Sequence, residues 1–338
     1  MAFGTDVGID LGTATVLIYV KGKGIVLNEP SVVAVDKVNK IIKKVGIEAQ
    51  QMLGRAPGTI EPVRPLKDGV ISDYDLTEKM IKYFLRKVLG NTSFWPRIMV
   101  CVPSSITEVE ILAVRNAVKK AGARHVYIIE EPIAAAIGAG IDIIKPCGNM
   151  VVDIGGGTTD IAVISLGGVA NKTSIKIAGD RFDEALIKYI RRKFNVLIGD
   201  RTAQDTKEAI GCVYIPTDII SIPVKGRCLM TGLPKTIDVN SEDMLAAFEE
   251  PANAISDAVC RVLEGTEPEL VADISRNKIH LTGGGSLVKG LAELLTVRTG
   301  IQTVVAEDAV SCVVRGTGIA LENEKLFAAI SHNALMSD

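Results

Sequence analysis

The sequence contains one short pattern twice. Residues 7–20 read VGIDLGTATVLIYV and residues 151–164 read VVDIGGGTTDIAVI. In both, an apolar strand-like run leads to an aspartate, a Gly/Thr turn and a second apolar run. A chain that repeats this unit is expected to fold into two related halves side by side, with a cleft between them.

The rest of the chain predicts an α/β fold. Strand-like and helix-like segments alternate along its 338 residues, which is enough for two ordinary domains. Apolar residues make up 47% and charged residues 23%, as is typical of a folded globular protein. The net charge of −2 and the aromatic content of 4% give no reason to expect a nucleic-acid partner.

The sequence also favours an intracellular protein. Its six cysteines include no C-x-x-C pair and lie in apolar surroundings, so we expect buried free thiols, as in a reducing cytosol. Asp6 and Asp10 interrupt the first apolar run, which argues against a signal peptide. No run of about 18 apolar residues predicts a membrane span.

One helix can be predicted from its two ends. Thr107 and Glu110 match a capping box, and Gly122 is expected to stop the helix that follows. Its apolar face consists of Ile111, Leu112, Val114, Ala117, Val118 and Ala121.

Other segments are predicted more coarsely. Pro132 suits the first turn of a helix, and a further helix is expected over residues 181–194. Residues 211–240 look less regular, and residues 279–295 read as strand, triple glycine and helix.

The two Gly/Thr turns are candidate phosphate-binding loops. A phosphate needs several backbone N–H donors at close range, and glycine leaves them accessible. One such turn alone is most often a simple hairpin, but two echoed turns and a third glycine loop favour phosphate binding. No G-x-x-x-x-G-K-[ST] occurs, which excludes a P-loop, and the second turn leads into a strand, which weakens a dinucleotide-binding interpretation. The candidate loop residues are Gly12, Thr13, Ala14 and Thr15 in the first turn and Gly155, Gly156, Gly157 and Thr158 in the second.

An aspartate precedes each turn and suggests a metal ion. Asp10 and Asp153 are expected at strand ends that face the same space. Carboxylates beside phosphates are tolerable only if a cation intervenes, so we expect Mg²⁺, bound mostly through its water shell. The third loop, Gly283–Gly285, is expected to open a helix whose N-terminus receives an α-phosphate or ribose oxygen.

Glu131 is the candidate for activating water. It stands at the start of a predicted helix, where the positive end of the helix dipole favours an ionised carboxylate. From there it could orient or deprotonate a water that attacks a γ-phosphate. Taken by itself, this position favours a helix-capping role alone.

The three loops together resemble those of the actin, sugar-kinase and heat-shock-chaperone ATPase superfamily. Longer strings resemble the MreB/Mbl family of bacterial actin homologues, which control cell shape. The resemblance runs from about residue 4 to about residue 322 and rests on these strings: GIDLGTA at 8–14, GKGIVLNEPSVVA at 22–34, RPLKDGVISDY at 64–74, IEEPIAAAIG at 129–138, NMVVDIGGGTTDIAVISLG at 149–167, IAGDRFDEA at 177–185 and LTGGGSLVKGL at 281–291.

This resemblance implies an actin-like fold, with two lobes of four subdomains around a nucleotide cleft. The implied subdomains are residues 1–32 with 75–144 (IA), 33–74 (IB), 145–178 with 245–338 (IIA), and 179–244 (IIB).

The resemblance also assigns roles in the cleft. Asp10 and Asp153 would serve Mg²⁺, and Glu131 would position the attacking water. Gln204 and Lys207 fall in the nucleoside-contacting helix, while Gly283–Gly285 and Ser286 form the adenosine loop.

Two residues depart from the family pattern. Asp160 stands where the family usually has a glutamate; if this acid helps to hold the water, hydrolysis is altered. Gln204 also replaces a glutamate, which makes the preference for ATP over GTP less secure.

The function that the resemblance implies is a filament protein with a slow ATPase that switches subunit contacts. Its implied partners are further copies in paired protofilaments, the anionic inner face of the plasma membrane, and membrane-embedded cell-wall elongation proteins. A sugar-type kinase, a chaperone ATPase module, and a plasmid-segregation or division actin on the same fold are the alternatives.

A loop at residues 91–96 bears on the membrane. It contains Phe94 and Trp95, the single tryptophan. An aromatic pair on a surface loop suits the lipid headgroup boundary, although it could equally cover a local core. The resemblance favours membrane contact, because some members of the family carry an apolar insertion loop here. Two residues bind lipid weakly, so avidity along a filament would be needed.

Overall fold

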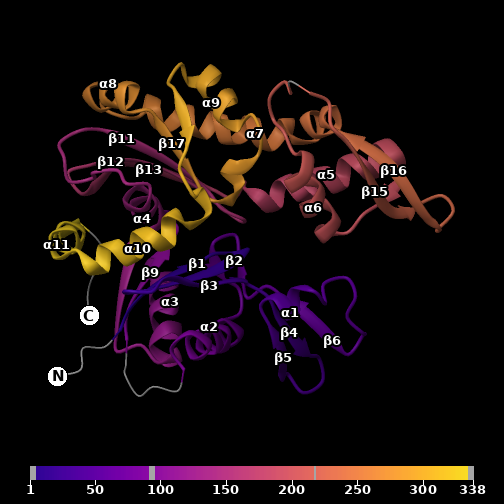
Figure 1. The fold of residues 1–338 in the computed structure, drawn as a ribbon, viewed down its shortest axis with the longest axis horizontal. Coiled ribbons are helices and arrows are strands. Elements are labelled where there is room, and N and C mark those ends of the chain that lie inside the picture. Colours follow the sequence, from indigo (N-terminus) through magenta and orange to yellow (C-terminus); the bar gives the residue numbers. More distant parts are fainter. Residues whose placement is uncertain (1–4, 91–95, 217, 334–338) are drawn as a thin grey trace.

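The repeated pattern forms the centre of two five-stranded sheets (Figure 1). The computed structural model describes residues 5–90, 96–216 and 218–333. In the first sheet, β1 (Asp6–Leu11) is antiparallel to β2 (Thr15–Val20) and parallel to β9 (Arg97–Val102). The outer strands of this sheet are β3 (Gly24–Pro30) beside β2 and β10 (His125–Glu130) beside β9.

The second sheet has the same topology. Here β11 (Asn149–Ile154) is antiparallel to β12 (Thr159–Ser165) and parallel to β17 (Ile279–Thr282). The outer strands are β13 (Gly168–Ile175) beside β12 and β18 (Thr303–Val305) beside β17. The two related halves and the α/β fold predicted from the repeat are confirmed.

The sheets lie in separate lobes, each with its own core. β11 is buried along its whole length, which explains its unbroken apolar run. A further core cluster spans the two lobes and includes Ile129 and Ile133 from the first half and Val151 and Ala162 from the second. Two helices meet in this cluster, α4 (Glu131–Gly138) and α10 (Cys312–Glu322), so the lobes are joined through a packed region.

A smaller sheet extends from each lobe toward the same side of the molecule (Figure 1). One consists of β4 (Val33–Asp36), β5 (Ile42–Val45) and β6 (Ile60–Val63), followed by the two-stranded hairpin β7 (Leu66–Lys67) and β8 (Val70–Ile71). The other consists of β14 (Val196–Leu197), β15 (Ser221–Cys228) and β16 (Pro234–Asn240).

The prediction of a less regular stretch at residues 211–240 is wrong for most of its length. β15 and β16 form a long antiparallel hairpin. Pro223 and Gly226 stand inside β15 and break the usual strand pattern, which is why the sequence hides it.

The helix predicted from Thr107 and Gly122 is confirmed. α3 (Glu108–Ala121) has Thr107 as its N-cap with both bonds of the capping box, and Gly122 as its C-cap. Of its predicted apolar face, Leu112 is an error, since it is 53% exposed. The remaining helices are α1 (Ile47–Gln50), α2 (Tyr74–Leu89), α5 (Gly179–Phe194), α6 (Asp200–Ile210), α7 (Ser241–Glu264), α8 (Pro268–Asn277), α9 (Leu291–Thr299) and α11 (Glu324–Asn333).

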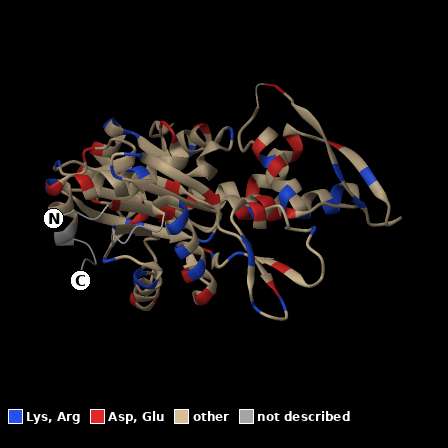
Figure 2. Cartoon of the chain, turned by 60° about the horizontal axis from the view of Figure 1, so that its bottom comes forward, with Lys and Arg blue, Asp and Glu red and all other residues tan. Residues whose placement is uncertain are grey.

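Several sequence-based expectations concern the whole chain. The six cysteines are free thiols, but Cys147, Cys228 and Cys260 are partly exposed rather than buried. None of the helices in the described ranges is long and apolar enough to cross a bilayer. Basic and acidic residues are interspersed over both lobes (Figure 2), in keeping with the small net charge. The limits of the four subdomains stay a prediction.

Candidate functional site

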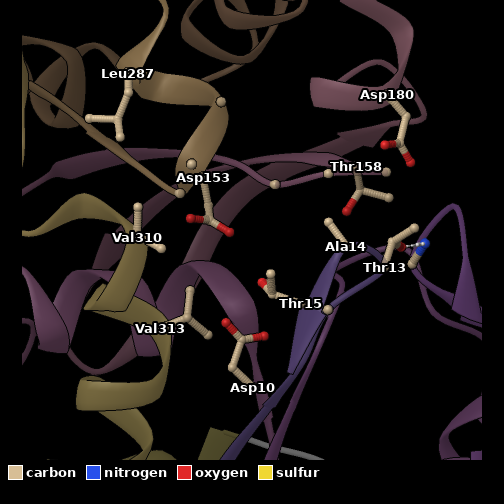
Figure 3. A pocket seen from close by; sticks show the side chains of 18 of the residues that line it. Asp10, Thr13, Ala14, Thr15, Asp153, Thr158, Asp180, Leu287, Val310 and Val313 are labelled. Atoms are coloured by element: carbon tan, nitrogen blue, oxygen red, sulfur yellow. Dashed lines mark hydrogen bonds between the residues drawn. The ribbon is translucent and has the colours of Figure 1, made fainter. Parts of the chain in front are cut away.

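A cavity of about 520 Å³ lies between the two lobes, and both Gly/Thr turns line it (Figure 3). The structure therefore brings together side chains and loops that are far apart in the sequence. The predicted site residues that line this cavity are Asp10, Gly12, Thr13, Ala14, Thr15, Glu131, Asp153, Gly155, Gly156, Gly157, Thr158, Gln204, Lys207, Gly283, Gly284 and Gly285.

The two turns approach each other so closely that their glycines are required. A Cβ on Gly156 would lie 2.6 Å from the Cβ of Ala14, and one on Gly157 would lie 2.7 Å from the hydroxyl of Thr13. Any side chain at either position would push the lobes apart. The backbone of both loops is thus available to a group that binds between them.

A third segment, which the sequence analysis missed, also reaches the loops. The backbone N–H of Gly69, at the tip of the β7–β8 hairpin, donates to the hydroxyl of Thr13 at 2.9 Å (Figure 3). Asp68 and Gly69 have positive φ angles of 50° and 78°, as a tight hairpin turn needs. The Asp-Gly dipeptide between two short apolar runs is the signal that could have located it.

Asp10, Asp153 and Glu131 face this cavity, and none of them forms an ion pair with another of the described residues. Asp10 and Asp153 point into it from the penultimate positions of β1 and β11 (Figure 3). Burial raises the pKa of Asp10 to about 6 and the pKa of Asp153 to about 7. The pKa of Glu131 is raised well above its usual value, first by burial and then by the charges of Asp160, Asp153 and Asp10.

This arrangement fits a divalent cation held through water. Across the described ranges, no three acidic, His or Cys side chains converge closely enough to hold a metal ion by themselves. Asp10 and Asp153 nevertheless face one space, and each would regain its ionised form beside a cation. They therefore suit Mg²⁺, which keeps several of its waters and takes its other ligands from phosphates.

On the other side of the cavity, a charged pair links α5 to α6. The ammonium of Lys207 donates to Asp183 and to the carbonyl of Gly179, both at 2.9 Å. Burial raises the pKa of Asp183 to about 6 despite this partner. Gln204 donates to Glu208 at 2.9 Å. The sequence does not mark Asp183 as a site residue; it becomes one only through its contact with Lys207 on another helix.

The apolar wall of the cavity comes from the C-terminal part of the chain. Leu287, Val310 and Val313 line it on the side away from Thr13 and Asp180 (Figure 3). The triple glycine leads into one turn of 3-10 helix, Gly284–Leu287, and not directly into an α-helix. The expected order of strand, triple glycine and helix is confirmed, but the loop itself opens this 3-10 turn, and α9 begins only at Leu291.

Two of the predicted residues that the structure describes, Asp160 and Ser286, do not line the cavity. Asp160 is fully buried behind the second loop, where its carboxylate accepts from the backbone N–H of Ser104 at 2.7 Å. The hydroxyl of Ser286 turns back to the carbonyl of Gly283 at 2.6 Å. Phe94 and Trp95 lie outside the described residues.

One ion pair crosses between the lobes at the edge of the cavity. Arg64, which follows β6, donates to both carboxylate oxygens of Asp180 at 3.0 and 3.1 Å. Asp180 belongs to the first turn of α5, and both residues line the cavity. This bifurcated contact, in which one guanidinium nitrogen (Nη1) reaches both oxygens, ties the small sheet of the first lobe to the second lobe.

The buried aspartates predict how stability changes with pH. The folded-state pKa values of Asp10 and Asp153 lie above the ordinary value of 3.8, so their protonated forms favour the fold. That contribution is complete below about pH 4 and is lost as the pH rises through 6 and 7. We expect the Tm of the nucleotide-free protein to fall between about pH 5 and about pH 8, and Asp153→Asn to flatten the fall. Scanning calorimetry at several pH values tests this; a Tm that rises over this range, or an unchanged slope in the variant, would contradict it.

Comparison with known proteins shows which sequence family this chain matches. Residues 4–329 match the family model described as MreB/Mbl protein. The chain is 51% identical to the cell shape-determining protein Mbl of Bacillus subtilis (strain 168), with 95% of this chain and 97% of that protein covered. It is 52% identical to the cell shape-determining protein MreB of Escherichia coli (strain K12), with 95% and 94% covered. Among solved structures, MreB5 of Spiroplasma citri bound to ADP superposes with a TM-score of 0.91 at 38% identity, covering 98% of this chain and 99% of that one.

Proposed function

The chain belongs to the MreB/Mbl family of actin-like proteins, and we propose that it is a nucleotide-dependent filament protein with a slow ATPase. It assembles on the inner face of the bacterial plasma membrane and helps to determine cell shape by organising cell-wall synthesis. The observation that carries this proposal is the cavity, in which two glycine loops and two aspartates from equivalent strands face each other. The ADP held by the similar MreB5 structure supports a nucleotide as the ligand.

Within the cavity, each part of the nucleotide has a matching wall. The backbone of Gly12–Ala14 and Gly155–Thr158 binds the phosphates, and the apolar wall at Leu287 and Val310 suits the base. Lys207 and Asp183 lie on the nucleoside side. ATP is the expected nucleotide and GTP the alternative, because Gln204 lacks the carboxylate usual at its position.

The proposed hydrolysis depends on acids that burial holds in place. Mg²⁺ at Asp10 and Asp153 would neutralise charge on the phosphates. Glu131 begins α4 and lines the cavity, so it can orient the attacking water and accept its proton. Asp160 acts from behind the loop, since its charge raises the pKa of Glu131 and makes it a better base. Its shorter side chain is consistent with a slow rate.

Closure of the cleft links the nucleotide to assembly in this proposal. The Gly69–Thr13 bond brings the β7–β8 hairpin onto the first loop, and the Arg64–Asp180 pair brings the end of the small sheet onto the second lobe. A γ-phosphate between the loops would favour this closed arrangement, and its release would relax it. Contacts between subunits that need both lobes in one orientation would then form with the γ-phosphate bound and weaken after its release.

Sedimentation tests the proposed function. We expect the protein to pellet as a polymer with Mg-ATP and to remain in the supernatant with EDTA. Gly156→Val should abolish pelleting, because its side chain would collide with Ala14 and hold the cleft open. Gly58→Ala, at a glycine with open space around it, is the matched control. Without ATP-dependent polymer the filament proposal is wrong, and a sugar that stimulates ADP release would indicate the kinase alternative.

The same assay with anionic liposomes tests the membrane. The proposed contact rests on the sequence of the loop with Phe94 and Trp95. Polymer should float with the liposomes, and Phe94→Ser with Trp95→Ser should release it without reducing polymer in the absence of lipid. Unchanged flotation of the double variant would reject this loop as the anchor. Contact with membrane-embedded cell-wall elongation proteins is part of the same proposal.

A further inference from the structure

Two buried side chains lie beneath the aspartates of the site, at equivalent places in the two halves. In the second sheet, Asp153 is paired in register with Thr282 on the parallel neighbour β17. In the first sheet, Ile9 is paired with Val100 on the parallel neighbour β9, so the next residues along are Asp10 and Cys101. The internal repeat therefore extends to the residues beside the aspartates, although the two side chains differ.

Each of these residues donates a hydrogen bond to its aspartate. The hydroxyl of Thr282 donates to Oδ1 of Asp153 at 2.7 Å, and the thiol of Cys101 donates to Oδ1 of Asp10 at 3.4 Å. Thr282 is 0% and Cys101 2% exposed. Both donors are thus shielded from water and engage the same oxygen atom of the equivalent carboxylate.

Such a bond fixes the plane of a carboxylate. The last torsion of an aspartate has broad, shallow preferences, so an unsupported carboxylate can rotate. A cation held through ordered waters needs acceptor oxygens in fixed places, and partners outside the ligands themselves supply this order. Because each bond engages Oδ1, it sets the direction in which the other oxygen points.

The two bonds are unequal in strength. A hydroxyl that donates to a carboxylate at 2.7 Å is a strong, charge-assisted hydrogen bond. A thiol is a weak donor, and its bond here is longer. The carboxylate of the second lobe is consequently held more firmly than that of the first.

We propose that Cys101 and Thr282 are paired positioning residues for the cation site, with Thr282 fixing Asp153 firmly and Cys101 fixing Asp10 loosely. This inference rests on the proposed function, since it assumes a magnesium nucleotide between the lobes. The firm carboxylate anchors the hydrated ion on the second lobe. The loosely held carboxylate of Asp10 lets the first lobe adjust as the cleft closes over the ion.

Magnesium-dependent binding of a fluorescent AMPPNP analogue tests the pairing. The measured quantity is the Mg²⁺ concentration for half-maximal binding, with the affinity in EDTA as a second readout. Thr282→Val removes the hydroxyl at nearly constant volume and should raise the half-maximal Mg²⁺ concentration about tenfold, with little change in EDTA. Thr282→Ser keeps the hydroxyl and should stay within about twofold of the parent protein.

The first lobe supplies the complementary comparison. Cys101→Ala should raise the half-maximal Mg²⁺ concentration only about threefold, because a thiol contributes a weak bond. Thr282→Cys, which gives the second lobe the donor of the first, should fall between Thr282→Ser and Thr282→Val. This variant and Cys101→Ala keep the proposal testable if Thr282→Val does not fold.

Three outcomes would overturn the inference. The first is a half-maximal Mg²⁺ concentration of Thr282→Val that lies within twofold of the value for the parent protein. Another is an equal loss of affinity with Mg²⁺ and in EDTA, which would indicate a purely structural role. The third is a larger effect of Cys101→Ala than of Thr282→Val or, if that variant does not fold, a half-maximal Mg²⁺ concentration of Thr282→Cys within twofold of the parent. Failure of the proposed function looks different, because the parent protein itself would then show no magnesium-dependent nucleotide binding.

Discussion

Replacing Glu131 with glutamine is expected to slow ATP hydrolysis at least about 100-fold while changing nucleotide affinity little. The substitution keeps the size and the hydrogen-bonding reach of the side chain but removes its ability to accept a proton. Glu131 lines the cavity from the first position of α4, whereas the phosphates are expected to bind the backbone of the two loops. Loss of the base should therefore appear in turnover and not in binding.

The environment of Glu131 explains why so large an effect is expected. Its carboxyl group is buried beside three other acids, which raises its pKa well above the usual value. A carboxylate made unstable in this way is a stronger base than one in water, provided that a nearby cation keeps it ionised. A helix-capping role, the alternative explanation of a glutamate at this position, would instead affect stability and leave turnover largely intact.

Glu130 provides the matched control for this experiment. It precedes Glu131 in the chain but pairs with Lys172 at 2.7 Å and does not line the cavity. Phosphate release under single-turnover conditions should be unchanged in Glu130→Gln and nearly absent in Glu131→Gln. Filaments of the Glu131 variant should also persist longer in Mg-ATP. Turnover within about threefold of the parent protein would remove Glu131 from the catalytic role.

The parts of the structure that depend on local pattern were predictable from the sequence. The repeated loops are visible because strands buried on both faces read as unbroken apolar runs, each ending at an aspartate. The helix capped by Thr107 was predictable for the same reason, since its capping box lies within one turn.

Contacts made across the fold were not predictable in this way. Asp183 and Arg64 are ordinary surface charges in the sequence and become site residues only because another element lies opposite them. The β15–β16 hairpin was missed because Pro223 contradicts the strand pattern. The pairing of β15 with β16 overrides that local preference. Local rules thus locate the loops, whereas tertiary pairing decides which charges face them.

Replacing Gly316 with alanine is expected to lower the free energy of unfolding strongly, although it adds only one methyl group. Gly316 lies in α10 where this helix crosses α4, and a Cβ there would overlap the carbonyl oxygen of Ala134. The crossing is reciprocal, because a Cβ on Gly138 in α4 would overlap the carbonyl oxygen of Cys312. Rotamer changes cannot relieve an overlap with backbone, so the two helices would have to move apart.

Such a separation reaches both lobes. α4 follows β10 of the first sheet, while α10 follows β18 of the second sheet and packs back onto β1. The crossing is therefore a point where the two lobes are packed together. We expect Gly316→Ala to reduce the free energy of unfolding by about 3 kcal/mol, which corresponds to a fall in Tm of about 4 °C for a chain of this length.

Thermal unfolding of Gly316→Ala beside Gly199→Ala tests this expectation. A Cβ on Gly199 would meet nothing within 4 Å, and its φ of −90° suits any residue, so that variant should melt within about 1 °C of the parent. An unchanged Tm in Gly316→Ala would mean that the helices yield easily and that the crossing is not a rigid contact. If the variant is instead destabilised as expected and still folds, it should also fail to pellet with Mg-ATP, because lobes held apart at this crossing cannot bring Gly156 against Ala14.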